Sequence, residues 1–127
     1  MAEAKDTGVY FENSQPIFRV EKMERALEFY VEKLGFRNAN WGGDDFTSVN
    51  RDNAGVYLCL RGQGSGKAWA WIGVSDVVQL REEIVARGVK LRMEPTNFAW
   101  AKEIHVEDPD GNVIRFGSEP DAERVEA

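Results

Sequence analysis

The chain has 127 residues, of which 43% are hydrophobic, so it is long enough for one domain and too short for two independent cores. Its net charge is −6, and no cluster of lysine and arginine interrupts the acidic balance. Such a chain repels phosphate backbones and anionic lipid surfaces, so we expect no nucleic acid and no membrane among its partners. The single cysteine, Cys59, cannot form an internal disulfide, and no signal peptide or membrane-length apolar run is visible, which favours a cytoplasmic protein.

The first half of the chain predicts a strand, a helix and three further strands. After a polar lead-in over residues 1–14, residues 15–20 read as a buried strand, and apolar residues then recur at helical spacing until Gly35. Gly35 is a natural helix stop, because glycine adopts the left-handed backbone conformation without strain. Strands are expected next at about residues 36–41, 45–50 and 54–60, separated by turn-forming residues.

The second half repeats this order after a glycine-rich linker over residues 61–67. A strand is expected at about 68–74, a helix over about 75–88, and strands at about 89–93, 101–107 and 112–116. The last two strands are joined by residues 108–111 (DPDG), in which proline second and glycine fourth suit a type I turn.

Neither half can bury its sheet alone, so the two halves must pack together as one domain. We therefore predict an α+β fold of two tandem βαβββ modules, residues 15–61 and 67–117. An N-terminal arm over residues 1–14 and a C-terminal tail over residues 118–127 flank them.

These features resemble the vicinal oxygen chelate superfamily, which includes glyoxalase I, extradiol dioxygenases and bleomycin-resistance proteins. The resemblance covers about residues 15–117 and is carried most by residues 25–30 (RALEFY), 34–36 (LGF) and 107–112 (EDPDGN). It implies that each module curls its sheet into half of an open cup, with the helices on the outer face.

The metal enzymes of that superfamily take their ligands from the equivalents of four positions, here Gln15, Leu58, Trp69 and Arg115. Only the glutamine offers a metal an oxygen, since a leucine has no lone pair, an indole only donates and a guanidinium repels a cation. The sequence therefore predicts no metal and no other cofactor.

Within the superfamily the chain most resembles the bleomycin-resistance proteins. The resemblance is carried by residues 44–46 (DDF), 50–52 (NRD), 68–71 (AWAW) and 98–103 (FAWAKE). Those proteins are dimers that hold a planar, cationic drug between aromatic side chains in grooves at the subunit interface. They bind the drug without changing it chemically. The resemblance implies that Phe46, Trp69 and Trp100 line such a groove, that Asp45 supplies a carboxylate beside it, and that residues 1–11 form an exchanged arm.

The residues themselves allow both a functional and a structural interpretation. Trp69 and Trp71 alternate onto one face of a strand, where they either form the floor of a groove or fill the core. Trp100 lies in an irregular stretch after residues 95–97, and a large aromatic side chain in a loop favours contact with a ligand or partner.

Two further residues carry charge or can gain it. His105 lies between two glutamates, which suggests acid–base work with Glu103 but is more typical of a histidine that simply binds a neighbouring carboxylate. Arg115 lies where the cavity is expected, and it either anchors a ligand or pairs with Glu103, because an unpaired buried charge is costly.

We therefore predict a metal-free, homodimeric binding protein that sequesters a planar, cationic antibiotic, with a small molecule as its ligand and no catalytic residue. Two alternatives stay open: an enzyme of the same fold (a glyoxalase-like lyase, a dioxygenase or an isomerase using His105 and Glu103) and a binding module for another aromatic metabolite. The predicted ligand-binding residues are Phe46, Trp69, Trp71, Trp100, Asp45, Leu58, Arg115 and His105.

Overall fold

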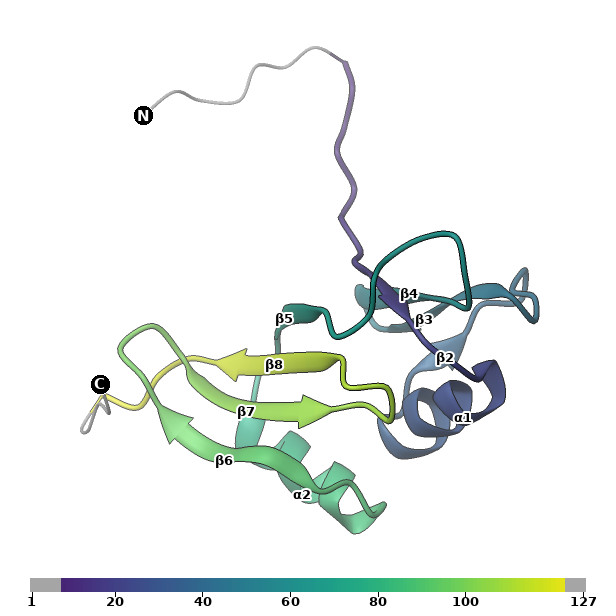
Figure 1. Cartoon of the computed structure of the whole chain (residues 1–127). Helices are drawn as coiled ribbons and strands as arrows, with labels where there is room; N and C mark the ends of the chain where they lie inside the picture. Colours follow the sequence, from purple (N-terminus) through teal and green to yellow (C-terminus); the bar gives the residue numbers. More distant parts are fainter. Residues whose placement is uncertain (1–7, 123–127) are drawn as a thin grey trace.

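The computed structural model describes residues 8–122, which form two four-stranded mixed sheets and two helical segments (Figure 1). The first sheet has the order β1-β4-β3-β2 and the second the order β5-β8-β7-β6. In each sheet one pair, β1 with β4 or β5 with β8, is parallel and the rest are antiparallel. The strands are β1 (Ile17–Arg19), β2 (Arg37–Asn38), β3 (Phe46–Arg51), β4 (Ala54–Cys59), β5 (Trp69–Gly73), β6 (Leu91–Asn97), β7 (Lys102–Glu107) and β8 (Val113–Ser118). The predicted α+β fold of two βαβββ modules is confirmed.

Each module has its helix between its first two strands. In the first, α1 (Met23–Leu27) continues into a π-helical turn, η1 (Glu28–Lys33), and the chain leaves it at Gly35, whose φ of 77° is left-handed. In the second, α2 (Val77–Ala86) begins at Asp76, whose side chain accepts a hydrogen bond from the Gln79 amide, and is followed by Gly88 at φ 93°. Both glycines end their helices as the sequence predicts.

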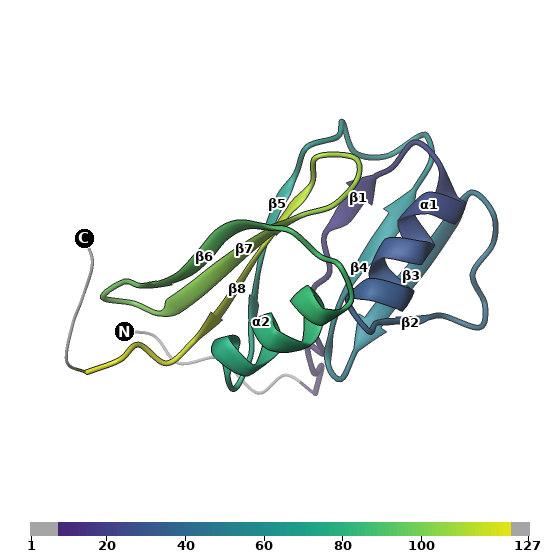
Figure 2. The same ribbon diagram turned by 90° about the horizontal axis from the view of Figure 1, so that it is seen from below.

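The two helices cover the same side of the sheets. Figure 2, seen from below, shows α1 and α2 lying in front of the strands. The side chains between helices and sheets form one continuous core that draws on both modules, including Phe18, Tyr30, Val56, Ile84, Ile104 and Phe116. Within residues 8–122 no helix covers the opposite side of either sheet, and we call these two sides the open faces.

Two predicted strands have different lengths in the structure. The strand expected at 36–41 is reduced to β2, because the chain turns away at residues 39–45. Conversely, β6 extends through Pro95 to Asn97, although this strand was expected to end at about residue 93. This edge strand shifts register against β7 twice, between Leu91 and Thr96, and edge strands with bulges tolerate a proline.

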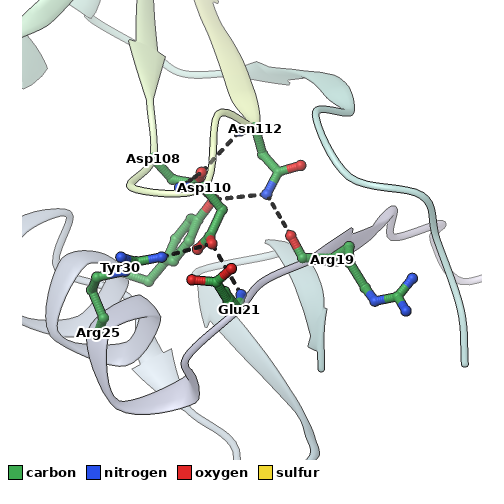
Figure 3. Close-up of polar contacts among 7 residues, drawn as sticks. All are labelled: Arg19, Glu21, Arg25, Tyr30, Asp108, Asp110 and Asn112. Carbon is green, nitrogen blue, oxygen red and sulfur yellow. Dashed lines mark hydrogen bonds and ion pairs between the residues drawn. The ribbon is translucent and has the colours of Figure 1, made fainter. Parts of the chain in front are cut away.

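The turn between β7 and β8 joins the second module to the first (Figure 3). The Asp108 carboxylate accepts hydrogen bonds from the Tyr30 hydroxyl at 2.9 Å and from the side-chain amide of Asn112 at 3.0 Å. The same Asn112 amide also donates to the Arg19 carbonyl, while Asp110 accepts from Arg25 at 2.8 Å. Residues 107–112 (EDPDGN), which carry part of the family resemblance, therefore connect the second module to the first.

The ends of the described chain behave differently. Val9, Tyr10 and Phe11 are all at least 69% exposed and extend away from the sheets (Figure 1), while residues 1–7 of the predicted arm lie outside the described residues. At the other end Asp121 forms backbone hydrogen bonds with the Asn97 side chain, and the rest of the predicted tail, 123–127, is likewise outside them. None of the helices in residues 8–122 has the length and apolar character needed to cross a membrane.

Candidate functional site

Three tryptophans gather on the open face of the second sheet. Trp69 and Trp71 project from β5 with 50% and 52% of their surface exposed, and Trp100 projects from the β6–β7 loop with 61% exposed. Alternation along β5 puts both strand tryptophans on this side, while Ala70 and Ile72 pack against the core. We call this surface, with the side chains of Glu103, His105 and Arg115 beneath the rings, the tryptophan face.

A buried carboxylate holds these side chains together. Glu103 on β7 is 0% exposed and accepts a hydrogen bond from the indole nitrogen of Trp71 at 3.0 Å and from that of Trp100 at 2.9 Å. The Arg115 guanidinium binds both of its oxygens at 2.9 Å, which is the strong bidentate geometry. His105 lies 3.0 Å from Oε1 through Nε2, and it donates there because an ionised carboxylate only accepts.

The hydrogen bonds decide the protonation state of Glu103. Burial by itself raises the pKa of this carboxyl, but the bonds from Arg115, His105, Trp71 and Trp100 outweigh burial and lower its pKa to about 2. Glu103 is therefore a carboxylate at neutral pH and a very weak base. An acid–base role for the Glu103–His105 pair does not fit this arrangement, whereas the predicted pairing of Arg115 with Glu103 is confirmed.

Each indole ring has one side supported by a neighbour. Trp100 stacks on Phe98 with ring centroids 4.7 Å apart and planes 4° apart. Trp71 lies against the backbone of β8, where a Cβ on Gly117 would approach its ring to 2.6 Å. Trp69 has the Arg92 guanidinium 5.2 Å from its ring centroid and meets His105 edge-on. Indoles fixed in this way, with about half of their surface still open, are prepared to stack on a flat ligand.

The open face of the first sheet carries a second aromatic group. Phe46 stacks on Tyr57 with centroids 5.2 Å apart, and Trp41, 59% exposed, leans on both rings. Asp45 is exposed next to Phe46 and lies 3.7 Å from Arg61. Within residues 8–122 no ring contact joins this group to the tryptophan face, so one copy of the chain does not bring all of the predicted residues together.

Leu58 does not lie at either open face. It is 0% exposed in the core, because β4 pairs Leu58 with Phe18 and points both side chains towards α1. The neighbouring Tyr57 has the open-face position instead, so the position implied by the resemblance is displaced by one residue. We leave Leu58 out of the candidate site.

The remaining positions of the metal enzymes carry no set of metal ligands here. Arg115 is bound to Glu103, Trp69 is a stacking surface, and the Gln15 amide is hydrogen-bonded to Asn50 and Ser48. Among the described residues no three His, Cys, Asp or Glu side chains are grouped so as to hold a metal ion.

A hollow of about 800 Å³ lies between the two modules. Its walls include Trp71 and Gly73 from β5, Gly55 from β4, and α2 residues such as Leu80 and Glu83. Of the residues that form the tryptophan face, Trp71 alone lines this hollow, whose other walls include Ser14, Pro16 and Ala54 of the first module.

Sequence reasoning missed the central position of Glu103 and the contribution of Tyr57. Glu103 was considered only as a partner for His105 or Arg115, yet its spacing of two from His105 placed both on one face of β7. Its contacts with the two tryptophans depend on the path of the β6–β7 loop, which the sequence does not indicate.

Comparison with known proteins places this geometry in a family. The model of the glyoxalase/bleomycin resistance protein/dioxygenase superfamily matches residues 14–116. No curated protein sequence matches the chain significantly.

Three solved structures illustrate the likeness of fold. The bleomycin-binding protein of the bleomycin producer Streptomyces verticillus, complexed with copper(II)-bleomycin, is 25% identical over 89% of this chain and 99% of its own, with a TM-score of 0.74. The antibiotic-binding protein TnmS3 of Streptomyces sp. CB03234 is also 25% identical over 89% and 99%, with a TM-score of 0.73. A glyoxalase/bleomycin resistance protein of Catenulispora acidiphila shares the fold at 23% identity over 85% and 98%, with a TM-score of 0.71. The chain belongs to the glyoxalase/bleomycin resistance protein/dioxygenase superfamily.

Proposed function

We propose that this protein is a metal-free binding protein of the bleomycin-resistance type, which captures a planar aromatic antibiotic and lowers its free concentration. The observation that carries the proposal is the set of exposed indoles, Trp71 and Trp100, whose N–H groups are fixed by the buried Glu103. Three exposed indoles on one face are costly in water unless they serve a ligand or a partner.

Binding explains the chemistry of the face better than catalysis. The Glu103 carboxylate is buried, and it already accepts hydrogen bonds from Trp71, Trp100, Arg115 and His105. Because its pKa is lowered to about 2, it carries no proton to donate at neutral pH and is a very weak base. What remains open is the flat surface of the indoles. Each stacked ring pair contributes roughly 0.5–1.5 kcal/mol beyond the burial of apolar area, so three rings supply about 1.5–4.5 kcal/mol of the roughly 8 kcal/mol that micromolar binding needs, and burial of apolar area must supply the rest.

The proposal includes a homodimer. Each open face is half of a groove, with the Phe46–Tyr57 stack on the first sheet and the indoles on the second. Two copies of the chain that place these halves opposite one another would enclose a planar ligand, and the exposed Asp45 would then lie beside its cationic part. Two of the similar structures are described as a bleomycin-binding and an antibiotic-binding protein, which supports this class of ligand.

Titration with bleomycin tests the proposal. Copper(II)-bleomycin and metal-free bleomycin are each titrated into the protein by calorimetry and by tryptophan fluorescence. We expect saturable heat, quenching of the fluorescence and a stoichiometry of one ligand per chain. Sedimentation equilibrium measures the dimer separately. If neither form produces heat or quenching at high micromolar ligand, bleomycin is not the ligand.

A pair of variants connects the binding to the tryptophan face. Trp100→Ala removes an exposed ring at little cost to the fold and is expected to weaken binding about tenfold, in line with the loss of one stacked aromatic. Val85→Ala is the control, since Val85 is 37% exposed on α2, on the side of the sheets opposite the open faces. Equal binding by both variants would contradict a site at the tryptophan face.

A further inference from the structure

Three polar side chains on the open face of the first sheet form a closed ring of hydrogen bonds. The Gln15 amide nitrogen donates to Asn50 Oδ1 at 2.9 Å, the Asn50 amide nitrogen donates to Ser48 Oγ at 2.7 Å, and the Ser48 hydroxyl donates to Gln15 Oε1 at 3.1 Å. We call these three residues the amide ring. It is uncharged, and both amide side chains are only partly buried.

The amide ring bridges over strand β4. Gln15 precedes β1, whereas Ser48 and Asn50 lie on β3, and β4 runs between these two strands. The bridge passes above Gly55, the register partner of Asn50, and a Cβ on Gly55 would overlap the Asn50 side chain. A glycine at this point of β4 therefore gives the amide ring its space.

The amide ring lies between two parts of the candidate site. Ser48 is the register partner of Tyr57, so the ring shares its face with the Phe46–Tyr57 stack. Gly55 also lines the hollow between the modules, as do Ser14 and Pro16 on either side of Gln15, and Trp71 lines the other side of that hollow. Gln15, Ser48 and Asn50 do not themselves line the hollow, so a ligand would reach the amide ring along the Phe46–Tyr57 stack, which the proposed dimer places opposite the indoles of the partner copy.

The hydrogen-bonding capacity of the ring is not exhausted by its internal bonds. A primary amide has two N–H donors and two lone pairs on its oxygen, and each of the two amides uses one of each within the ring. The remaining donors and lone pairs match a neutral group that carries a donor and an acceptor side by side. A charged group would find no opposite charge in the ring.

We propose that the amide ring binds a carboxamide, or a group with the same donor–acceptor pair, on the planar ligand of this protein. This inference rests on the proposed function, because the ring acts on the same ligand as Trp71. It assigns the first sheet a role in selecting the polar substituent, while the indoles of the second sheet bind the flat ring system.

Two matched probes test the inference in the full chain. Naphthalene-2-carboxamide and methyl naphthalene-2-carboxylate share a flat ring and a carbonyl, but only the amide has N–H donors. Both are titrated into ¹⁵N-labelled protein, and the indole N–H signals and the side-chain amide signals are followed by NMR. We expect the carboxamide to bind about 3- to 10-fold more tightly than the ester, which is the effect of one or two hydrogen bonds.

Variants locate this preference. Asn50→Ala is expected to reduce the preference to less than about twofold while ester binding stays within about twofold of the wild type. Gln15→Met, which keeps the size of the side chain at a part-buried position, is expected to do the same if Asn50→Ala does not fold. Gln63→Ala is the matched control, because Gln63 is an exposed amide in the linker between the modules and lines neither the hollow nor the amide ring.

Each outcome decides the question. Equal affinity of the wild type for the two probes, or an undiminished preference in folded Gln15→Met, would overturn the role of the amide ring and leave aromatic binding intact. If neither probe shifts any indole signal at millimolar concentration, both the proposed function and this inference are contradicted.

Discussion

Strand β7 has a buried carboxylate near each end, and the two have opposite surroundings. Glu103, near the start of β7, accepts from the Arg115 guanidinium as well as from two indoles and a histidine. Asp108, just after its end, accepts only neutral donors, from the Tyr30 hydroxyl, from Asn112 and from the backbone of its own turn. Burial raises the pKa of Asp108 above its ordinary value because these neutral donors do not outweigh it, whereas the pKa of Glu103 falls to about 2.

The comparison separates a functional cluster from a structural one. The donors to Glu103 are side chains whose other surfaces are open, so the carboxylate prepares a binding face. The donors to Asp108 are buried between the modules, so that carboxylate fastens the second module to α1 and β1 (Figure 3). Variants at the first are expected to change binding and stability together, and variants at the second to change stability alone.

The largest effect is expected from Glu103→Gln. The amide cannot accept all of the donors and leaves the Arg115 charge without its partner, which costs on the order of 2–4 kcal/mol of unfolding free energy, with Arg115 partly relieved by water. Denaturant unfolding measures the loss, and ligand titration should show weaker binding. Glu94→Gln is the control, because Glu94 is an exposed carboxylate that pairs with Arg81 at the surface. A loss of equal size there would remove the special role of Glu103.

Acid unfolding sharpens the same comparison. The lowered pKa of Glu103 contributes stability that is complete above about pH 4.5, the unfolded value, and is lost as the pH falls towards 2. The raised pKa of Asp108 acts in the opposite sense, since its protonation is favoured in the folded state. We expect the pH dependence of unfolding between pH 4.5 and 2 to be shallower in Glu103→Gln than in the wild type. An unchanged slope would contradict the assignment.

Tyr30→Phe tests the structural cluster and is expected to have a smaller effect. Removing the hydroxyl takes one of the donors from buried Asp108, which costs about 1–2 kcal/mol. Binding of the planar ligand should not change, because Tyr30 is in the core behind the sheet. Tyr57→Phe is the matched control for stability, since no hydrogen bond involves the Tyr57 hydroxyl within the described chain. A loss of binding in Tyr30→Phe at unchanged fold would break the division between the clusters.

Gly117→Ala is expected to have the smallest effect on stability, about 1 kcal/mol, because the half-exposed Trp71 ring can tilt away from the added methyl group. The tilt moves the Trp71 indole away from Glu103 and weakens the hydrogen bond between them. The NMR signal of the Trp71 indole N–H should therefore shift, and ligand affinity should fall severalfold. Gly43→Ala is the control, as its Cβ would meet only the Phe46 carbonyl at 3.9 Å. An unmoved indole signal in Gly117→Ala would contradict the packing of Trp71 on β8.

The sequence predicted the fold well and the site in part. Repeated periodicity and the glycines after the helices are local signals, so the two modules and their helix ends could be recognised from them. Trp69 and Arg115 both lie on the open face of the second sheet, and their contact with a ligand stays a prediction. The side chain at Leu58 was expected on the wrong face of β4, because a shift of one residue in a strand exchanges its two faces.

The cluster around Glu103 was beyond local patterns. It joins β5, β7, β8 and the loop that carries Trp100, and these segments meet only through the sheet order β5-β8-β7-β6. The amide ring likewise depends on β1 and β3 lying on either side of β4. Sheet order sets which distant side chains meet, and it is a property of the whole fold.

The central claim is that the indoles held by Glu103 are the binding surface. An NMR titration of the ¹⁵N-labelled protein with metal-free bleomycin tests it most directly, by following the indole N–H signals of the four tryptophans. The account predicts saturable shifts of the Trp71 and Trp100 signals at the same midpoint, and loss of those shifts in Glu103→Gln at a pH and temperature where that variant is folded. Saturable binding that leaves both signals unmoved, or that persists unchanged in folded Glu103→Gln, would contradict it.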